Sequence, residues 1–83
     1  MTSYKHIGQR LGRFREALEL NQRQMAEIAD VSEENWSDFE SGKRRISLNA
    51  AIRLCEECGL SLDWIYFGRP DVLPPHVRKK LPD

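Results

Sequence analysis

The sequence predicts an all-α protein, a compact bundle of five short helices. Three observations lead to this fold class. Apolar residues recur three and four positions apart, which is the spacing of a helix that buries one side. Asn or Ser precedes several of these stretches and Gly follows several of them, as expected at the two ends of a helix. No stretch of the chain is a candidate strand.

The size and composition indicate one small globular domain. The chain has 83 residues, of which 40% are hydrophobic and 31% charged. We expect the domain to span residues 1–68 and a tail to span 69–83. The tail should be extended or disordered, because four prolines interrupt regular structure around it: Pro70, Pro74, Pro75 and Pro82. With no apolar run of membrane length and no signal-peptide segment, a cytoplasmic protein with reduced cysteines is expected.

The first helix is expected to begin at a cap on Thr2 or Ser3 and to end near Leu20. Two glycines inside it, Gly8 and Gly12, have two interpretations: they allow another segment to approach closely, or they are surface positions that weaken the helix. The apolar stripe of this helix consists of Ile7, Leu11, Phe14 and Leu18.

The second helix is expected to run from about Gln22 to Ala29. Asn21 can cap it, with Gln24 as the reciprocal partner in a capping box. Its buried side should comprise Met25, Ala26 and Ala29.

A tight turn at Asp30 and Val31 joins this helix to a third, which Ser32 should cap and which should end near Glu40. Two short helices joined in this way form the arrangement that lays the second helix in the DNA major groove. Trp36 and Phe39 are expected to face the core. The outward positions are then Glu33, Glu34, Ser37 and Asp38.

Two further helices complete the bundle. Ser47 should cap a helix from about Leu48 to Cys58, and Gly59 should end it. Its apolar side should comprise Leu48, Ala51, Leu54, Cys55 and Cys58. Ser61 should cap a short helix that is closed by Gly68 and is unusually apolar for a surface helix. One of its aromatic rings is expected to complete the core and another to form an exposed patch for dimerisation. The candidate dimer residues are Trp64, Ile65, Tyr66 and Phe67.

In their order and spacing, several short motifs in these predicted helices and turns resemble the Cro/repressor-type (XRE-like) helix-turn-helix family, which has the lambda-repressor-like DNA-binding fold. The resemblance spans Ile7 to Gly68. It implies a sequence-specific transcriptional regulator that acts as a homodimer on double-stranded DNA and is neither an enzyme nor dependent on a cofactor. The matching pieces are Ile7 to Leu11 with Arg15, Asn21-Gln22 with Met25-Ala26, Val31-Ser32, Phe39 to Arg44, and Leu60 to Trp64 with Gly68.

The resemblance also implies roles for single residues. Arg15 and Glu40 would form an ion pair, although two unrelated surface charges would leave the same pattern. Gln22 would donate to a DNA phosphate, or else be an exposed first-turn residue. A basic loop would grip the DNA backbone, or else be an ordinary solvated loop: Lys43, Arg44 and Arg45.

The positions that commonly contact base edges in this family are acidic here: Glu33, Glu34 and Asp38. A carboxylate can accept a hydrogen bond from the cytosine amino group, so acidic base recognition is possible. Two like charges 8 Å apart at an effective dielectric of about 20 nevertheless repel by roughly 2 kcal/mol. The formal net charge of zero gives DNA binding no support. The alternative hypothesis is therefore a protein-interaction or dimerisation module with a basic partner and weak or no DNA binding.

Other chemistry is not predicted. Cys55 and Cys58 have the spacing of half a zinc site, but the two histidines, His6 and His76, lie toward opposite ends of the chain. Both cysteines also fall on the apolar side of their helix, where small buried thiols are common, and this interpretation is preferred. No nucleophile motif or phosphate-binding loop is present. We expect no metal, cofactor, membrane or small-molecule ligand.

Overall fold

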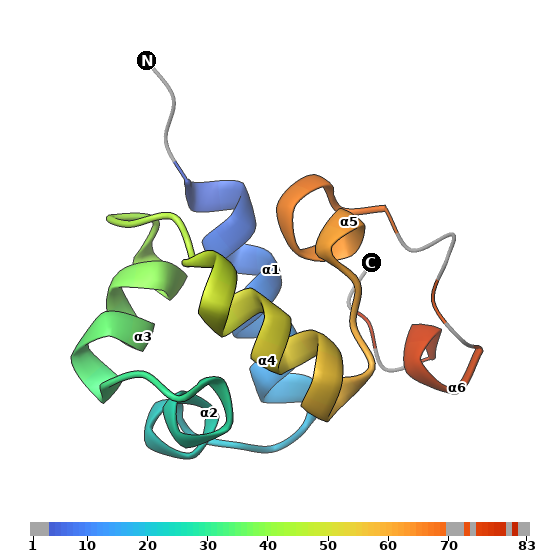
Figure 1. Ribbon diagram of the computed structural model, residues 1–83, viewed down its shortest axis with the longest axis horizontal. Helices are drawn as coiled ribbons and strands as arrows, with labels where there is room; N and C mark the ends of the chain where they lie inside the picture. The colour runs from blue at the N-terminus through green and yellow to red at the C-terminus, as the bar shows by residue number, and fades with distance from the viewer. Residues whose placement is uncertain (1–3, 70–72, 74, 80, 82–83) are drawn as a thin grey trace.

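A computed structural model describes residues 4–69, 73, 75–79 and 81, and within them the protein is all-α, as predicted. Figure 1 shows α1 and α4 passing through the middle, α2 and α3 on one side, and α5 and α6 on the other. None of these helices is long and apolar enough to cross a membrane. The helices are α1 (Lys5–Ala17), α2 (Gln22–Ala29), α3 (Glu33–Ser41), α4 (Leu48–Cys58), α5 (Leu62–Phe67) and α6 (Pro75–Arg78).

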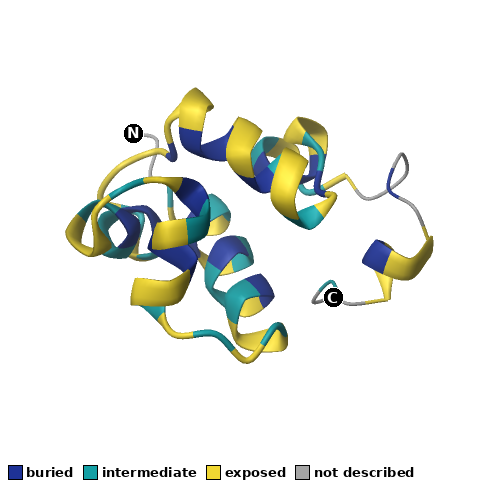
Figure 2. Ribbon diagram, turned by 60° about the horizontal axis from the view of Figure 1, so that its bottom comes forward, coloured by how far each residue is buried: buried dark blue, intermediate teal, exposed yellow. Residues whose placement is uncertain are grey.

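The core is apolar throughout, and no polar or charged residue in the described part of the chain is buried. Figure 2 shows the buried positions of the helices turned toward one another. Phe14 and Trp64 meet edge to face with ring centroids 5.7 Å apart, which joins α1 to α5. The largest fully buried side chains are Trp36, Phe14, Leu11, Met25, Ile46, Leu54 and Ile65.

The predicted caps of α2 to α5 are confirmed. Asn21 and Gln24 form the reciprocal capping box at the start of α2. Ser32, Ser47 and Ser61 each accept a hydrogen bond from the backbone N–H three residues later. These bonds satisfy donors that a helix leaves unpaired in its first turn, so each helix begins at a defined residue.

Helix α1 is shorter than predicted at both ends. It begins at Lys5, with Tyr4 as a cap that makes no side-chain hydrogen bond, and the expected caps Thr2 and Ser3 lie outside the described residues. It ends at Ala17 because Glu19 takes a left-handed φ of 60° and turns the chain toward α2.

Helix α6 was not predicted, so the described residues form six helices rather than five. Pro75 stands at its first position, where the missing N–H costs no helix hydrogen bond. Leu73 and Val77 are buried against the core, which stabilises a turn of helix in a segment expected to be extended or disordered. Pro70, Pro74 and Pro82 lie outside the described residues.

The apolar side of α4 also differs from the prediction. Leu48 is 56% exposed, whereas Ala50, Ala51 and Leu54 are buried. The face of α4 that packs on α2 and α5 is therefore rotated away from Leu48. Leu48 is left on the surface one helical turn from Ile52, which is also exposed.

Candidate nucleic-acid interface

A turn of fixed geometry connects α2 to α3. Asp30 adopts the left-handed conformation, with φ of 59° and ψ of 45°, which Asp tolerates better than most residues. The Val31 N–H donates to the Ala26 carbonyl at 3.0 Å, and Ser32 then caps α3. The turn thus sets the direction in which α3 leaves α2.

The Glu40 carboxylate on α3 collects hydrogen bonds from three helices. Arg15 of α1 donates to both of its oxygens, from Nε at 2.6 Å and from Nη2 at 3.1 Å. Gln22 of α2 donates to Oε1 at 3.0 Å, and the Trp36 indole of α3 donates to Oε2. Arg15 also donates from Nη1 to the Leu20 carbonyl at 2.8 Å. The predicted ion pair is present, as the centre of a larger network.

The surroundings keep this pair charged. Burial alone would raise the pKa of the Glu40 carboxyl, but hydrogen bonds from Arg15, Gln22 and Trp36 bring that pKa below its ordinary value. The hydrogen bond to Glu40 in turn raises the pKa of the Arg15 guanidinium. A carboxylate held by this many donors stays ionised through the neutral range, so it holds α3 against α1 and α2 continuously.

Two glycines let α1 and α3 cross at close range. A Cβ added at Gly8 would lie 2.3 Å from the Glu40 carbonyl oxygen and 2.5 Å from that of Phe39. A Cβ at Gly12 would lie 3.3 Å from Oε1 of Glu40. Close approach is therefore the correct interpretation of these glycines, and Gly8 lets the backbone of α1 pack directly on the end of α3.

The outward edge of α3 is less acidic than its sequence suggests. Glu33 and Glu34 are exposed and have no ion pair among the described residues. Asp38 and Ser37 are half-buried. Arg44 faces the Asp38 carboxylate with Nε 3.6 Å from Oδ2, and its backbone N–H donates to the Asp38 carbonyl at 3.2 Å. Two of the three predicted carboxylates therefore lack a countercharge within the part of the chain that the structure describes.

The basic loop after α3 is exposed at Lys43, Arg44 and Arg45, as a surface for phosphates requires. Arg45 lies over the Tyr4 ring, with its guanidinium carbon 5.6 Å from the ring centroid. At the other end of the motif, Arg23 is exposed in the first turn of α2. Arg23 was not among the predicted site residues, although its place beside Gln22 could have indicated it.

Gln22 lies differently from the prediction. Its side-chain amide donates into the protein, to Glu40, and the residue is half-buried. An amide nitrogen carries two hydrogens, so one donor remains beyond this bond. Gln22 therefore helps to position α3, a role that was not predicted from the sequence.

The predicted dimer residues separate into two groups. Trp64 and Ile65 are 3% and 0% exposed, so they belong to the core of the single chain and cannot form an interface. Tyr66 is half-buried and its hydroxyl donates to the Ile46 carbonyl at 2.8 Å. Phe67 is 69% exposed. Short as it is, α5 must turn Trp64 and Ile65 inward to pack on α1 and α4, which corrects the prediction for these two residues.

The remaining candidates do not assemble into a site. Cys55 and Cys58 are half-buried on α4 and form no disulfide. Within the described ranges, no group of three His, Cys, Asp or Glu residues is placed to hold a metal ion.

Comparison with known proteins yields a match to a family model. The family model described as a helix-turn-helix domain matches residues 6–64, from the start of α1 into α5. This match confirms the family resemblance predicted from the sequence. No curated protein and no solved structure matches the chain.

Proposed function

The chain belongs to the helix-turn-helix domain family, and on this premise we propose that it is a sequence-specific transcriptional regulator that binds double-stranded DNA as a homodimer. The family supports DNA binding in general. The observation that carries the finer proposal is the Glu40 network, which holds α3 rigidly while its outer edge stays exposed. A preorganised recognition helix is what base contacts require.

In the proposed complex, cations on both sides of α3 hold the DNA backbone. Lys43 and Arg45 in the loop and Arg23 at the start of α2 would contact phosphates, together with the free donor of Gln22. These contacts position the helix but carry no sequence information. Ser37 and Arg44 would add backbone contacts beside them.

Glu33 and Glu34 would then set the base preference. Each can accept from a cytosine amino group in the major groove, and each repels phosphates wherever that partner is missing. Asp38 contributes less net charge because Arg44 faces it. Acidic recognition of this kind favours specificity over raw affinity, since a mismatched site leaves a carboxylate unpaired.

We place the dimer contact on an exposed apolar face of α4 and α5 rather than on Trp64 and Ile65. Leu48 and Ile52 project one turn apart on α4, and Leu48 lines the same shallow hollow as Tyr66 of α5. Leu62 and Phe67 of α5 are also exposed. Sedimentation equilibrium tests the assignment: Ile52→Glu should shift a dimer to monomer, while Arg53→Glu next to it should not.

The test of DNA binding is selection of sites from random duplexes, followed by gel shifts at two ionic strengths. We expect one enriched motif, and an affinity that falls steeply with added salt because phosphate contacts release counterions. Failure to retain any duplex, even in dilute buffer, would rule the proposal out.

A second function is supported by the same exposed glutamates. Glu33 and Glu34 lack a countercharge among the described residues, so the outer edge of α3 would also suit a basic protein partner. The double variant Glu33→Gln with Glu34→Gln separates the two functions. Base recognition predicts loss of sequence preference, whereas mere repulsion predicts an equal gain of affinity for every duplex.

A further inference from the structure

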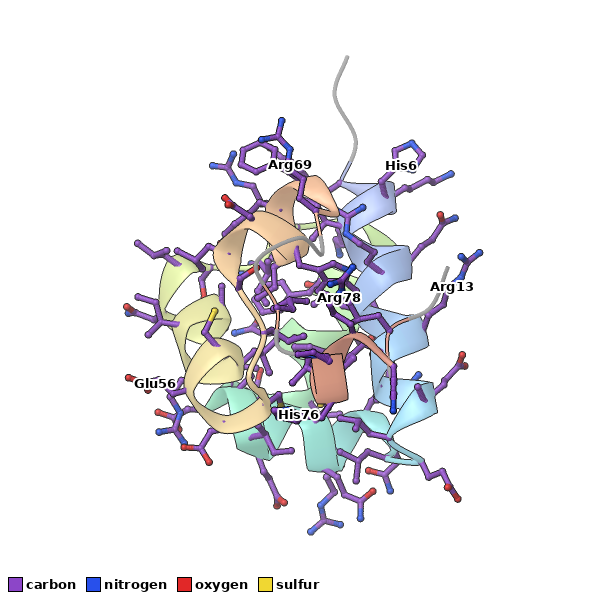
Figure 3. The ribbon with its side chains drawn as sticks, turned by 90° about the vertical axis from the view of Figure 1, so that its right-hand side faces the viewer. His6, Arg13, Glu56, Arg69, His76 and Arg78 are labelled. Carbon is purple, nitrogen blue, oxygen red and sulfur yellow. The ribbon has the colours of Figure 1, made fainter. Side chains whose placement is uncertain are left out.

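A hollow of about 360 Å³ lies where α1 begins and α5 ends. Figure 3 shows His6 and Arg69 projecting at this end of the molecule, while Arg13 projects farther along α1. In the part of the chain that the structure describes, no Asp or Glu lines the hollow. Its wall instead combines aromatic rings with groups that can carry positive charge: Tyr4, Tyr66, Phe67, His6, Arg10 and Arg45.

Arg10 is the most unusual member of this wall. Its Nη2 donates to the Ile65 carbonyl at 3.0 Å, but its Nε is buried without a hydrogen-bond partner. No carboxylate of the described chain pairs with it, and burial lowers the pKa of its guanidinium. A buried, unsatisfied donor on a charged group is costly, and a small shift of the guanidinium toward an acceptor supplied from outside the protein would relieve that cost.

The other side of the hollow offers a second cation and faces for stacking. Arg45 packs on the ring of Tyr4 and has no carboxylate partner in the described residues. The hydrogen bond from the Tyr66 hydroxyl to Ile46 holds that ring beside the loop. Guanidinium groups bind carboxylates and phosphates through paired hydrogen bonds, and aromatic rings stack on planar groups.

We propose that this hollow binds a small ligand made of a planar ring and an oxyanion. The oxyanion would lie on Arg10 and Arg45, and the ring would lie against Tyr4, Tyr66 or Phe67. The volume is within the range of about 300–1,000 Å³ that small-molecule sites occupy. This site runs against the expectation of no small-molecule ligand, since its residues come together only through the packing of α1, α5 and the basic loop.

Such a ligand would weaken DNA binding, a consequence that rests on the proposed function. Arg45 belongs to the loop proposed to contact phosphates. A ligand that engages Arg45 withdraws this cation from DNA. Because such coupling is reciprocal, bound DNA must weaken binding of the ligand by the same factor. The hollow would thus serve as an effector site.

Adenosine 5′-monophosphate is a suitable probe because it carries both parts of the proposed ligand. Titrated into the full chain and followed by the ¹⁵N NMR signals of the arginine Nε–H groups, it should shift Arg10 and Arg45 saturably, with a Kd of about 1 mM or tighter. Adenosine alone and inorganic phosphate alone should each bind about tenfold more weakly, since each lacks one set of contacts.

Two matched variants sharpen the test. Arg45→Gln should weaken binding of the monophosphate by about tenfold, because it removes a charged donor from an exposed position and leaves the core intact. Arg13→Gln, on the same helix as Arg10 but outside the hollow, should change nothing.

Three results would overturn the proposal: no saturable shift up to about 10 mM probe, equal binding by Arg45→Gln, or phosphate alone binding as tightly as the monophosphate. Because this titration contains no DNA, its failure is separate from failure of the duplex selection. Where both succeed, the probe should lower duplex affinity in the parent protein and not in Arg45→Gln.

Discussion

At the α1–α3 crossing, one carboxylate collects donors from three helices, whereas α6, at the other end of the molecule, rests on the core through apolar side chains. The first contact is directional: Arg15 must reach both oxygens of Glu40, and Gly8 must leave room for the α3 backbone. The second requires only that Leu73 and Val77 find an apolar surface. Exact contact geometry is therefore required at the α1–α3 crossing, where α3 is held, and much less at α6.

Breaking the ion pair should have the largest effect. Arg15→Met leaves the Glu40 carboxylate partly buried without its cation, so we expect a loss of about 3–5 kcal/mol in the free energy of unfolding. Urea denaturation followed by circular dichroism measures it. Arg13→Met, exposed on the same helix, is the control and should cost little. Equal stabilities of the two variants would mean that the network does not hold the fold.

Adding a side chain at Gly8, where α1 crosses α3, should have the second largest effect on stability. Ala is the better helix former by about 1 kcal/mol, but its Cβ at position 8 would lie 2.3 Å from a backbone oxygen that cannot move freely. We expect Gly8→Ala to destabilise the protein by about 1–3 kcal/mol overall, measured as a lower urea midpoint. Gly12→Ala should cost less, because its contact is the end of a side chain. A stabilising Gly8→Ala would contradict the close crossing.

The packing of α6 on the core should tolerate substitution better than the α1–α3 crossing does. Val77→Ala removes two buried methyl groups beside Gly59 and should cost about 1–2 kcal/mol. Because α6 makes no part of the proposed interface, duplex affinity should remain that of the parent protein below the melting range. Arg78→Ala, exposed on the same helix, is the matched control. A change in DNA affinity would show that α6 and α3 are coupled.

Lowering the pH should produce the smallest of these effects on stability, and it should act at the α1–α3 crossing. The pKa of Glu40 is lowered in the folded state, so its stabilising contribution is complete above the unfolded value of about 4.3 and is lost as pH falls through the folded pKa. Urea midpoints measured from neutral to acid pH should therefore fall less steeply for Glu40→Gln than for the parent. If the urea midpoints of the two proteins fell in parallel with pH, other carboxyl groups would be responsible for the loss of stability in acid.

Much of the fold could be predicted because its signals are local. The caps at Asn21, Ser32, Ser47 and Ser61 depend on residues three positions away, and each was placed correctly. Helix α6 was missed because Pro-rich composition argued against it, while burial of Val77 by distant residues outweighed that preference.

At the candidate site the ion pair was predicted, and the other hydrogen bonds to Glu40 were missed. Family resemblance identified Arg15 with Glu40, but nothing local indicated that Gln22 and Trp36 would join them. Likewise the pairing of Arg44 with Asp38 depends on how the loop folds back on α3.

By itself the sequence determined the existence of helices α1 to α5, the turn between α2 and α3, and the family, because helix periodicity, caps and turn residues act over three or four positions of one chain. Only the tertiary structure decided which charges are neutralised, which apolar residues of α4 and α5 remain on the surface, and that Arg10 and Arg45 border one hollow. Those outcomes depend on contacts between residues far apart in the chain, whose distances and burial exist only after the helices have packed.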